Sequence, residues 1–188
     1  MILTWGRIAI APLFFLFYEL ADAYGAPLLV GVWATFLIME VSDLLDGHFA
    51  RTRNQESDIG KVLDPFADAL SRLTYFVAFA GTGILPLWIL LILIYRDVAV
   101  AYIRVMVSKS QVLMPARTSG KLKAWIYAFA GFGGIVAFSV KKLGLFTVVS
   151  VDIVQGIALW LFVLAAAVAL WSLTDYAAFF LKNYRKSS

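Results

Sequence analysis

Residues 42–72 read SDLLDGHFARTRNQESDIGKVLDPFADALSR, and this stretch decides the fold that we expect. It places four aspartates inside or beside two strongly apolar segments: Asp43, Asp46, Asp64 and Asp68. A charged side chain at the centre of a membrane helix costs roughly 2.5–3.5 kcal/mol on insertion scales. Four neighbouring carboxylates would also repel one another. The arrangement is therefore favourable only if cations neutralise it.

The spacing of these residues sorts them onto two helix faces, at 100° per residue. One face of the first segment carries Asp43, Asp46, Gly47, Ala50 and Arg51, and one face of the second carries Gly60, Lys61, Asp64, Asp68 and Arg72. The short connection makes the two helices antiparallel neighbours, so their polar faces can converge. Two divalent ions about 3.5–4 Å apart suit such a cluster and phosphoryl chemistry.

Composition places the whole chain in a membrane. Its 188 residues are 62% apolar, with a mean hydropathy of +0.86, against about 45–50% apolar residues in soluble domains. The length fits a single domain over residues 1–188. Cysteine is absent and His48 is the only histidine, which we interpret as interfacial. Any metal site must then use oxygen ligands, which favours Mg²⁺, Mn²⁺ or Ca²⁺.

Six apolar segments are long enough to cross a bilayer, which takes about 20 residues. They predict an all-α protein with transmembrane helices over residues 3–20, 27–49, 60–81, 84–107, 121–140 and 151–181. The last segment exceeds one perpendicular span, so we expect it to tilt or to end at the interface. The first segment lacks the charged start and cleavage site of a signal peptide, so we keep it as mature structure.

Basic residues predict the orientation, because they gather on the cytoplasmic side. They are frequent between the second and third segments, between the fourth and fifth, and in the tail, whereas the opposite connections carry few. Both termini and the aspartates should therefore face the cytoplasm, which places the protein in the inner membrane. The basic rim suits anionic lipid headgroups.

Other interpretations of the same residues remain open. The charged stretch also fits a solvated loop held by salt bridges, and Gly47 and Gly60 taken alone are typical helix-packing glycines. A divalent-cation transporter with an aspartate relay is an alternative of a different class. Its aspartates would lie near the bilayer midplane, whereas these lie towards one surface.

Eight fixed positions of this stretch resemble the signature of the CDP-alcohol phosphatidyltransferase family: Asp43, Asp46, Gly47, Ala50, Arg51, Gly60, Asp64 and Asp68. The resemblance implies that CDP-diacylglycerol donates a phosphatidyl group to an alcohol and that CMP leaves. It implies Mg²⁺ or Mn²⁺ as cofactor, in a two-ion site. It also implies a homodimer. Membrane lipids are expected partners, and nucleic acid is not.

The resemblance also implies roles for the matching residues. Asp43, Asp46 and Asp64 would bind the metal ions, and Asp68 would be the general base for the acceptor hydroxyl and touch one metal ion as well. The donor would be bound by a set of four residues: Gly47, Ala50, Arg51 and Gly60.

The acceptor is expected to be a small phosphorylated alcohol, because cations gather at the inner ends of the fourth and fifth segments. These cations are Arg104, Arg117, Lys121 and Lys123. Within the family, the start of the chain and the segments around Arg96 and Gly120 resemble the phosphatidylglycerophosphate synthases, which implies glycerol 3-phosphate. Ala124 and Tyr127 depart from that group's pattern. Inositol phosphate, serine and choline or ethanolamine headgroups remain alternatives, and positive-inside topology alone would also explain the cations.

Overall fold

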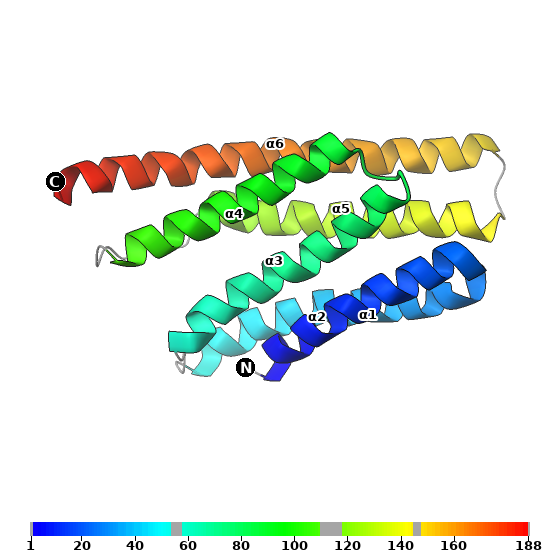
Figure 1. The fold of residues 1–188 in the computed structure, drawn as a ribbon, viewed down its shortest axis with the longest axis horizontal. Coiled ribbons are helices and arrows are strands. Elements are labelled where there is room, and N and C mark those ends of the chain that lie inside the picture. Colours follow the sequence, from blue (N-terminus) through cyan, green and yellow to red (C-terminus); the bar gives the residue numbers. More distant parts are fainter. Residues whose placement is uncertain (1, 54–57, 110–117, 145–147, 188) are drawn as a thin grey trace.

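The computed structural model describes the backbone of residues 2–53, 58–109, 118–144 and 148–187, and the side chains of residues 4–43, 65–107, 118–144 and 151–182. Every regular element in these ranges is helical (Figure 1). The elements are α1 (Ile2–Tyr24), the short 3-10 helix η1 (Ala26–Leu28), α2 (Leu29–Arg53), α3 (Asp58–Gly81), α4 (Leu87–Lys109), α5 (Thr118–Leu143) and α6 (Val148–Ser187).

The all-α fold and the six predicted helices are confirmed over the described residues. The shortest of the six long helices has 23 residues, which corresponds to about 35 Å. Among the residues that the structure describes, three segments are both long and apolar enough to cross a membrane: Ala26–Asp43, Thr118–Leu143 and Val151–Lys182. The other helices include α3 and α4, which carry Asp68 and the pair Arg96–Asp97 within them. The number of six spans therefore stays a prediction.

Tight turns make consecutive helices antiparallel neighbours. After α1, Gly25 has φ +97° and Pro27 follows within η1, and a positive φ of this kind favours glycine. Between α3 and α4, Gly83 has φ +76° and Pro86 directly precedes the first residue of α4. These short connections bring α1 against α2, and the end of α3 close to the start of α4.

The helix ends are sorted between the two ends of the molecule. Both termini lie towards one end, together with the last residues of α2 and α4 and the first residues of α3 and α5 (Figure 1). We call this the terminal end. Helices α1, α2 and α3 pack together on one side, and α4, α5 and α6 on the other, with α3 and α5 in contact between the two sets. Of the predicted site residues with described side chains, Arg104, Lys121 and Lys123 lie close to this end of α4 and α5, whereas Asp43 and Asp68 lie ten residues from the ends of α2 and α3.

Aromatic rings fill the centre of the bundle. The largest fully buried side chains include Phe14, Tyr18, Tyr75, Phe76, Phe79, Tyr127, Phe138 and Phe162. Two glycines of α5 let rings of α3 approach its backbone. A Cβ atom on Gly134 would lie 2.4 Å from Cε2 of Phe79, and one on Gly131 would lie 2.9 Å from Cε2 of Tyr75. Both distances are too short for a real Cβ contact, so larger residues there would separate α3 from α5.

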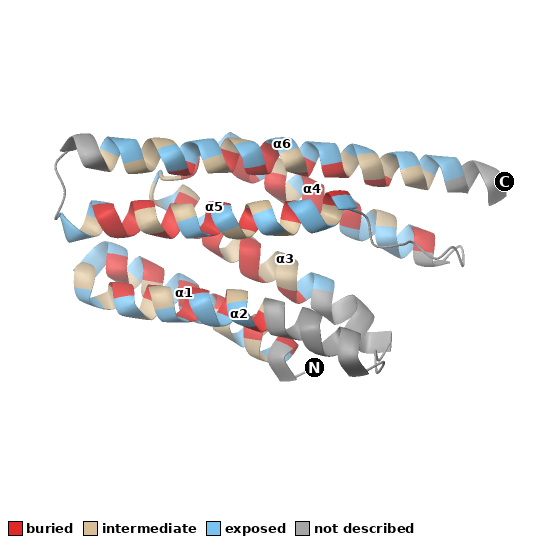
Figure 2. Ribbon diagram, turned by 180° about the vertical axis from the view of Figure 1, so that it is seen from behind, coloured by how far each residue is buried: buried red, intermediate tan, exposed pale blue. Residues whose placement is uncertain are grey.

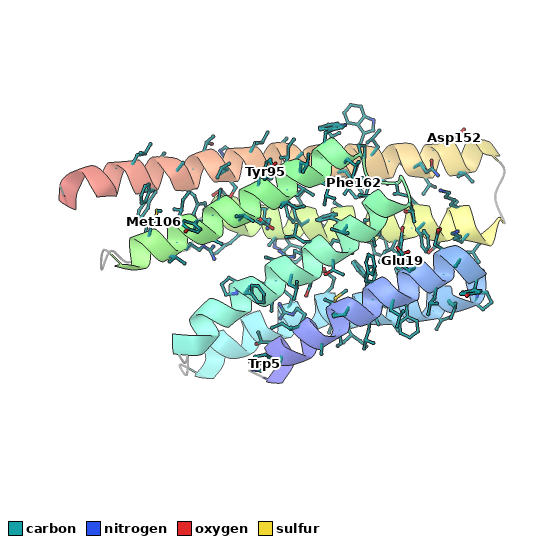
Figure 3. All side chains as sticks on the ribbon, viewed as in Figure 1. Trp5, Glu19, Tyr95, Met106, Asp152 and Phe162 are labelled. Carbon is teal, nitrogen blue, oxygen red and sulfur yellow. The ribbon has the colours of Figure 1, made fainter. Side chains whose placement is uncertain are left out.

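Large apolar side chains also cover the outside of the bundle. Exposed strips run along α4 and α6, and the buried strips face inwards (Figure 2). Trp160 is 75% exposed, and Tyr95 and Met106 stand out from α4 (Figure 3). Soluble monomers rarely expose apolar surface so extensively. This surface and the candidate spans identify a membrane protein.

Candidate functional site

Asp43 and Asp68 meet between the three helices of the first set, ten residues before the end of α2 and ten residues after the start of α3. Asp43 lies on α2 and Asp68 on α3, and an arginine from α1 joins them. Nη1 of Arg7 donates to Oδ1 of Asp43 at 3.1 Å and also forms an ion pair with Asp68. Nη2 of Arg72, one turn beyond Asp68 on α3, donates to Oδ2 of Asp43 at 2.7 Å. Each of the helices α1, α2 and α3 thus supplies at least one charged side chain to this cluster.

The acids and the bases of this cluster differ in their accessibility. The side chains of Asp43 and Asp68 are 26% and 36% exposed, whereas those of Arg7 and Arg72 are 2% and 8% exposed. The arginines are therefore enclosed by the helices, whereas the two carboxylates remain partly accessible.

A further carboxylate lies behind this pair. Glu40 stands one turn before Asp43 on α2, and its side chain is partly buried. Sequence reasoning did not single it out, although its spacing from Asp43 places it on the same side of α2. The three acids Glu40, Asp43 and Asp68 outnumber the two arginines.

Several predicted site residues lie outside the described side chains. These are Asp46, Gly47, Ala50, Arg51, Gly60 and Asp64, whose backbone belongs to α2 or α3. Arg117 lies outside the described residues altogether. Among the described side chains, no group of three acids and histidines is close enough to hold a metal ion. The structure thus brings together Asp43 and Asp68, and it leaves the other predicted ligands as predictions.

The cluster nevertheless fits a hard divalent cation. Its accessible groups are carboxylates, which Mg²⁺ and Mn²⁺ prefer. Two guanidinium groups already lie against Asp43, so positive charge is stabilised at this point. Asp46 and Asp64 each stand about one turn along the same helices from this pair.

A second polar cluster lies inside the other set of helices. Its members are Arg96 and Asp97 of α4, Lys123 of α5 and Ser172 of α6, all buried. Nζ of Lys123 lies 2.8 Å from Oδ1 and 3.1 Å from Oδ2 of Asp97. Arg96 donates through Nη1 to Oδ1 of Asp97 at 2.9 Å and through Nη2 to Oγ of Ser172 at 2.6 Å. Two cations share one carboxylate, so one positive charge is in excess.

The two clusters approach each other across the bundle. Tyr75 of α3 lies with its hydroxyl 3.5 Å from the backbone oxygen of Tyr127 on α5. Nζ of Lys123 lies 4.0 Å from the centre of the Tyr127 ring, and Tyr75 follows Arg72 by about one turn of α3. The cationic cluster thus faces the acidic one through two tyrosines.

The predicted acceptor cations do not form one group. Lys123 points inwards and is buried, whereas Lys121, two residues earlier, is exposed. Arg104 is exposed on α4 and donates through Nη2 to the hydroxyl of Tyr176 on α6 at 2.9 Å. Only Lys123 of the described set lies in the buried cluster.

Two arginines matter more than their sequence signal indicated. Arg7 lies at the start of the chain and Arg96 lies in α4, and both segments only weakly resemble the phosphatidylglycerophosphate synthases. The available signal was their type, because a buried arginine inside an apolar helix needs a partner. Their partners come from other helices, however, and only the packing reveals them.

Comparisons with known proteins show the family of the chain. Residues 1–171 match the CDP-alcohol phosphatidyltransferase family. The CDP-diacylglycerol–glycerol-3-phosphate 3-phosphatidyltransferase of Treponema pallidum is 31% identical over 111 residues, which cover 59% of this chain and 49% of that protein. The cardiolipin synthase (CMP-forming) of Streptomyces coelicolor is 43% identical over 98 residues, or 51% of this chain and 45% of that protein.

A third relative matches over more of its length. The CDP-diacylglycerol–glycerol-3-phosphate 3-phosphatidyltransferase of Bacillus subtilis is 27% identical over 171 residues, which cover 82% of this chain and 89% of that protein. The chain thus spans about half the length of the first two relatives and most of the third. The family match, by contrast, covers nearly the whole chain, from residue 1 to residue 171 of 188. The chain therefore belongs to the CDP-alcohol phosphatidyltransferase family.

Proposed function

We propose that this protein transfers a phosphatidyl group from CDP-diacylglycerol to glycerol 3-phosphate and releases CMP. The observation that carries the proposal is the meeting of Asp43 and Asp68, from two helices, at an accessible point within the matched family region. Asp43, Asp46 and Asp64 would hold the metal ions, with Asp68 beside them. Bound Mg²⁺ or Mn²⁺ would neutralise the pyrophosphate of the donor and stabilise the departing CMP.

Asp68 is the proposed general base. Its carboxylate is more exposed than that of Asp43, at 36% against 26%, so an acceptor hydroxyl can reach it. Asp68 takes the proton of that hydroxyl, and the alcohol oxygen attacks the phosphatidyl phosphorus. The bond from this phosphorus to the CMP phosphate then breaks. Arg51, Gly47, Ala50 and Gly60 are proposed to hold the donor nucleotide.

An apolar groove between α1 and α3 suits an acyl chain of the donor. It has a volume of about 410 Å³ and lies between α1 and α3, lined by Ala11, Pro12, Phe15, Leu70, Leu73, Thr74 and Val77. On α3 the groove is lined by Leu70, Leu73, Thr74 and Val77, which lie on the opposite face of this helix from Asp68. Thr74 donates its hydroxyl to the backbone oxygen of Leu70 at 2.7 Å. The groove supports a lipid donor whose chain lies against α3.

The acceptor phosphate is proposed to lie against the cluster of Arg96 and Lys123. Its excess positive charge, buried in the bundle, is favourable when an anion arrives. Arginine also binds phosphate with two parallel hydrogen bonds. The facing position of the two clusters would put the acceptor hydroxyl near Asp68.

Phosphatidylglycerol is a second candidate acceptor, which would give cardiolipin. The observation in its favour is the 43% identity to the cardiolipin synthase of Streptomyces coelicolor. Both candidates present a glycerol hydroxyl and a phosphate. They differ in that one is water-soluble and the other lies in the bilayer.

An acceptor screen tests the proposal directly. Purified protein in lipid nanodiscs is given CDP-diacylglycerol and Mg²⁺, and CMP release is measured with each acceptor in turn. We expect release with glycerol 3-phosphate and none with free glycerol, because the buried cations would stay unpaired. Release with phosphatidylglycerol alone would support the second candidate. CMP release only with serine, inositol phosphate or choline would overturn both candidate acceptors. A protein that releases no CMP but conducts divalent cations would instead be a transporter.

The metal requirement has a separate test. Exhaustive treatment with EDTA should abolish CMP release, and Mg²⁺ or Mn²⁺ should restore it. The reason is that clustered carboxylates cannot approach the donor pyrophosphate without neutralising cations. Full activity after such treatment would contradict the proposal.

The setting in the cell is proposed from the same residues. Six spans, cytoplasmic termini and an inner-membrane location follow from the basic rim and from the sorting of helix ends (Figure 1). The terminal end would then face the CDP headgroup of CDP-diacylglycerol in the inner leaflet and glycerol 3-phosphate in the cytoplasm. A homodimer is proposed from the family resemblance.

A further inference from the structure

Arg7 joins the carboxylates of Asp43 and Asp68, although it lies on α1, outside the aspartate motif. Its guanidinium contacts Oδ1 of both Asp43 and Asp68, and its side chain is 2% exposed. A buried guanidinium in an apolar bundle needs anionic partners. Here the partners are the same two groups that are proposed to meet a divalent cation.

Arg72 differs from Arg7 in how its charge is compensated. It donates to Oδ2 of Asp43 at 2.7 Å and also lies close to Glu40. Arg72 and Asp68 stand on the same helix, α3, so a contact between them would not link Asp68 to another helix. Arg7 is the described arginine that ties α1 to both carboxylates. Movement of its side chain would change the link between α1 and the α2–α3 pair.

We propose that Arg7 is a positioning residue that holds Asp68 against Asp43 and competes with the divalent cations for these carboxylates. Metal binding then loosens the contact between Arg7 and Asp68, and the first turns of α1 are released from α3. Like charges at close range repel, so the guanidinium and the cation favour different arrangements of the same acids. The inference rests on the divalent site of the proposed function.

The first experiment measures Mn²⁺ binding without any substrate, by electron paramagnetic resonance on protein in nanodiscs. Arg7→Gln should tighten Mn²⁺ binding by about tenfold, the scale expected when one nearby positive charge is removed from a partly solvated site. Arg7→Lys keeps the charge and should bind Mn²⁺ nearly as the wild type does. A merely structural role for Arg7 would not give this recovery with Lys or any tightening with Gln.

The second experiment measures thermal unfolding in EDTA and in saturating Mn²⁺. Arg7→Gln should unfold at a lower temperature in EDTA, because two neighbouring carboxylates lose a shared counter-charge, and should gain more from Mn²⁺ than the wild type. The double variant Arg7→Gln/Asp68→Asn removes both partners and should recover part of the loss. If the single variant does not fold, folding of the double variant supports the pairing, and failure of both overturns it.

A matched control removes another ion pair of α1. Lys142 of α5 lies 2.6 Å from Oδ1 of Asp22 at the other end of α1, and Lys142→Met should leave Mn²⁺ binding unchanged. An unchanged or weaker affinity for Mn²⁺ in Arg7→Gln overturns the competition while the proposed function stands. Absence of Mn²⁺ binding to the wild type would overturn the inference together with the metal part of the proposed function. Because no CDP-diacylglycerol is present, the outcome is independent of the identity of the acceptor.

Discussion

Asp43 and Asp68 stand in different surroundings although they share Arg7. Both oxygens of Asp43 accept from arginines, whereas Asp68 is more exposed. A residue held from two sides suits a fixed metal ligand, and a more accessible one suits proton transfer to an arriving alcohol. The two acids are therefore expected to respond differently to the same substitution.

Asp68→Asn should lower kcat by at least about a hundredfold, the lower end of what general-base catalysis contributes. Donor binding should remain, because the amide keeps the shape of the carboxylate but cannot accept the proton. Binding is measured with a fluorescent CDP-diacylglycerol analogue and turnover by CMP release. A wild-type rate would exclude the base role, and loss of donor binding would make Asp68 mainly a metal ligand.

Lys123→Gln should raise the acceptor KM at least about tenfold with little change in the donor KM. The reason is that a buried cation contributes most to binding a phosphate where water is excluded. Asp97 keeps Arg96 as a partner in the variant. Lys141→Gln, at the far end of the same helix and bonded only weakly to the backbone oxygen of Thr82 at 3.4 Å, serves as the control. Equal effects of both substitutions on the acceptor KM would argue against a phosphate site at Lys123.

At the scale of helices, periodicity predicted which residues share a face of one helix. Which residues of different helices meet was decided by packing. The faces of α2 and α3 could be read from residue spacing, because side-chain direction repeats with the helical turn. Arg7 could not be assigned to Asp68, because the register of α1 against α3 depends on contacts between distant residues. The same holds for Lys123 and Lys121, since the inward face of α5 is set by rings packing on Gly131 and Gly134.

The groove between α1 and α3 gives a prediction about the donor. Thr74→Trp fills the groove and should raise the KM for CDP-diacylglycerol several-fold while leaving the acceptor KM unchanged. The matched control is Val98→Trp on α4, where the side chain is 57% exposed and away from the groove. Rates are compared for donors with long and short acyl chains. An effect independent of chain length, or equal to that of the control, would remove the groove from donor binding.

At the scale of the whole molecule, the sorting of helix ends agrees with an even number of crossings. The all-α fold could be predicted because long apolar segments form helices in a bilayer, where every backbone group must be bonded internally. The number of spans could not be fixed in the same way, because charges within α3 and α4 lower their apolar character. Those charges are compensated by neighbouring helices, which the sequence of one segment does not show.

The orientation can be tested by labelling single cysteines, because the natural chain has none. Tyr24→Cys, at the end of α1 and 77% exposed, should react with an impermeant maleimide added outside spheroplasts. Lys182→Cys, towards the C-terminal end of α6, should react only after the membrane is opened. Each variant must retain CMP release to count. The reverse labelling pattern would invert the proposed topology, and labelling of both from outside would exclude six spans.

The ion cluster of α4 also has a consequence for how the chain is synthesised. Arg96 and Asp97 lie near the middle of α4, and each would cost about 2.5–3.5 kcal/mol in an isolated membrane helix. Lys123 becomes available 26 residues after Asp97, and Ser172 follows Arg96 by 76 residues. While the ribosome is still producing α5 and α6, α4 lacks these partners. We therefore expect α4 to stay beside the translocon until the later helices emerge, so that the order of insertion need not follow the order of translation.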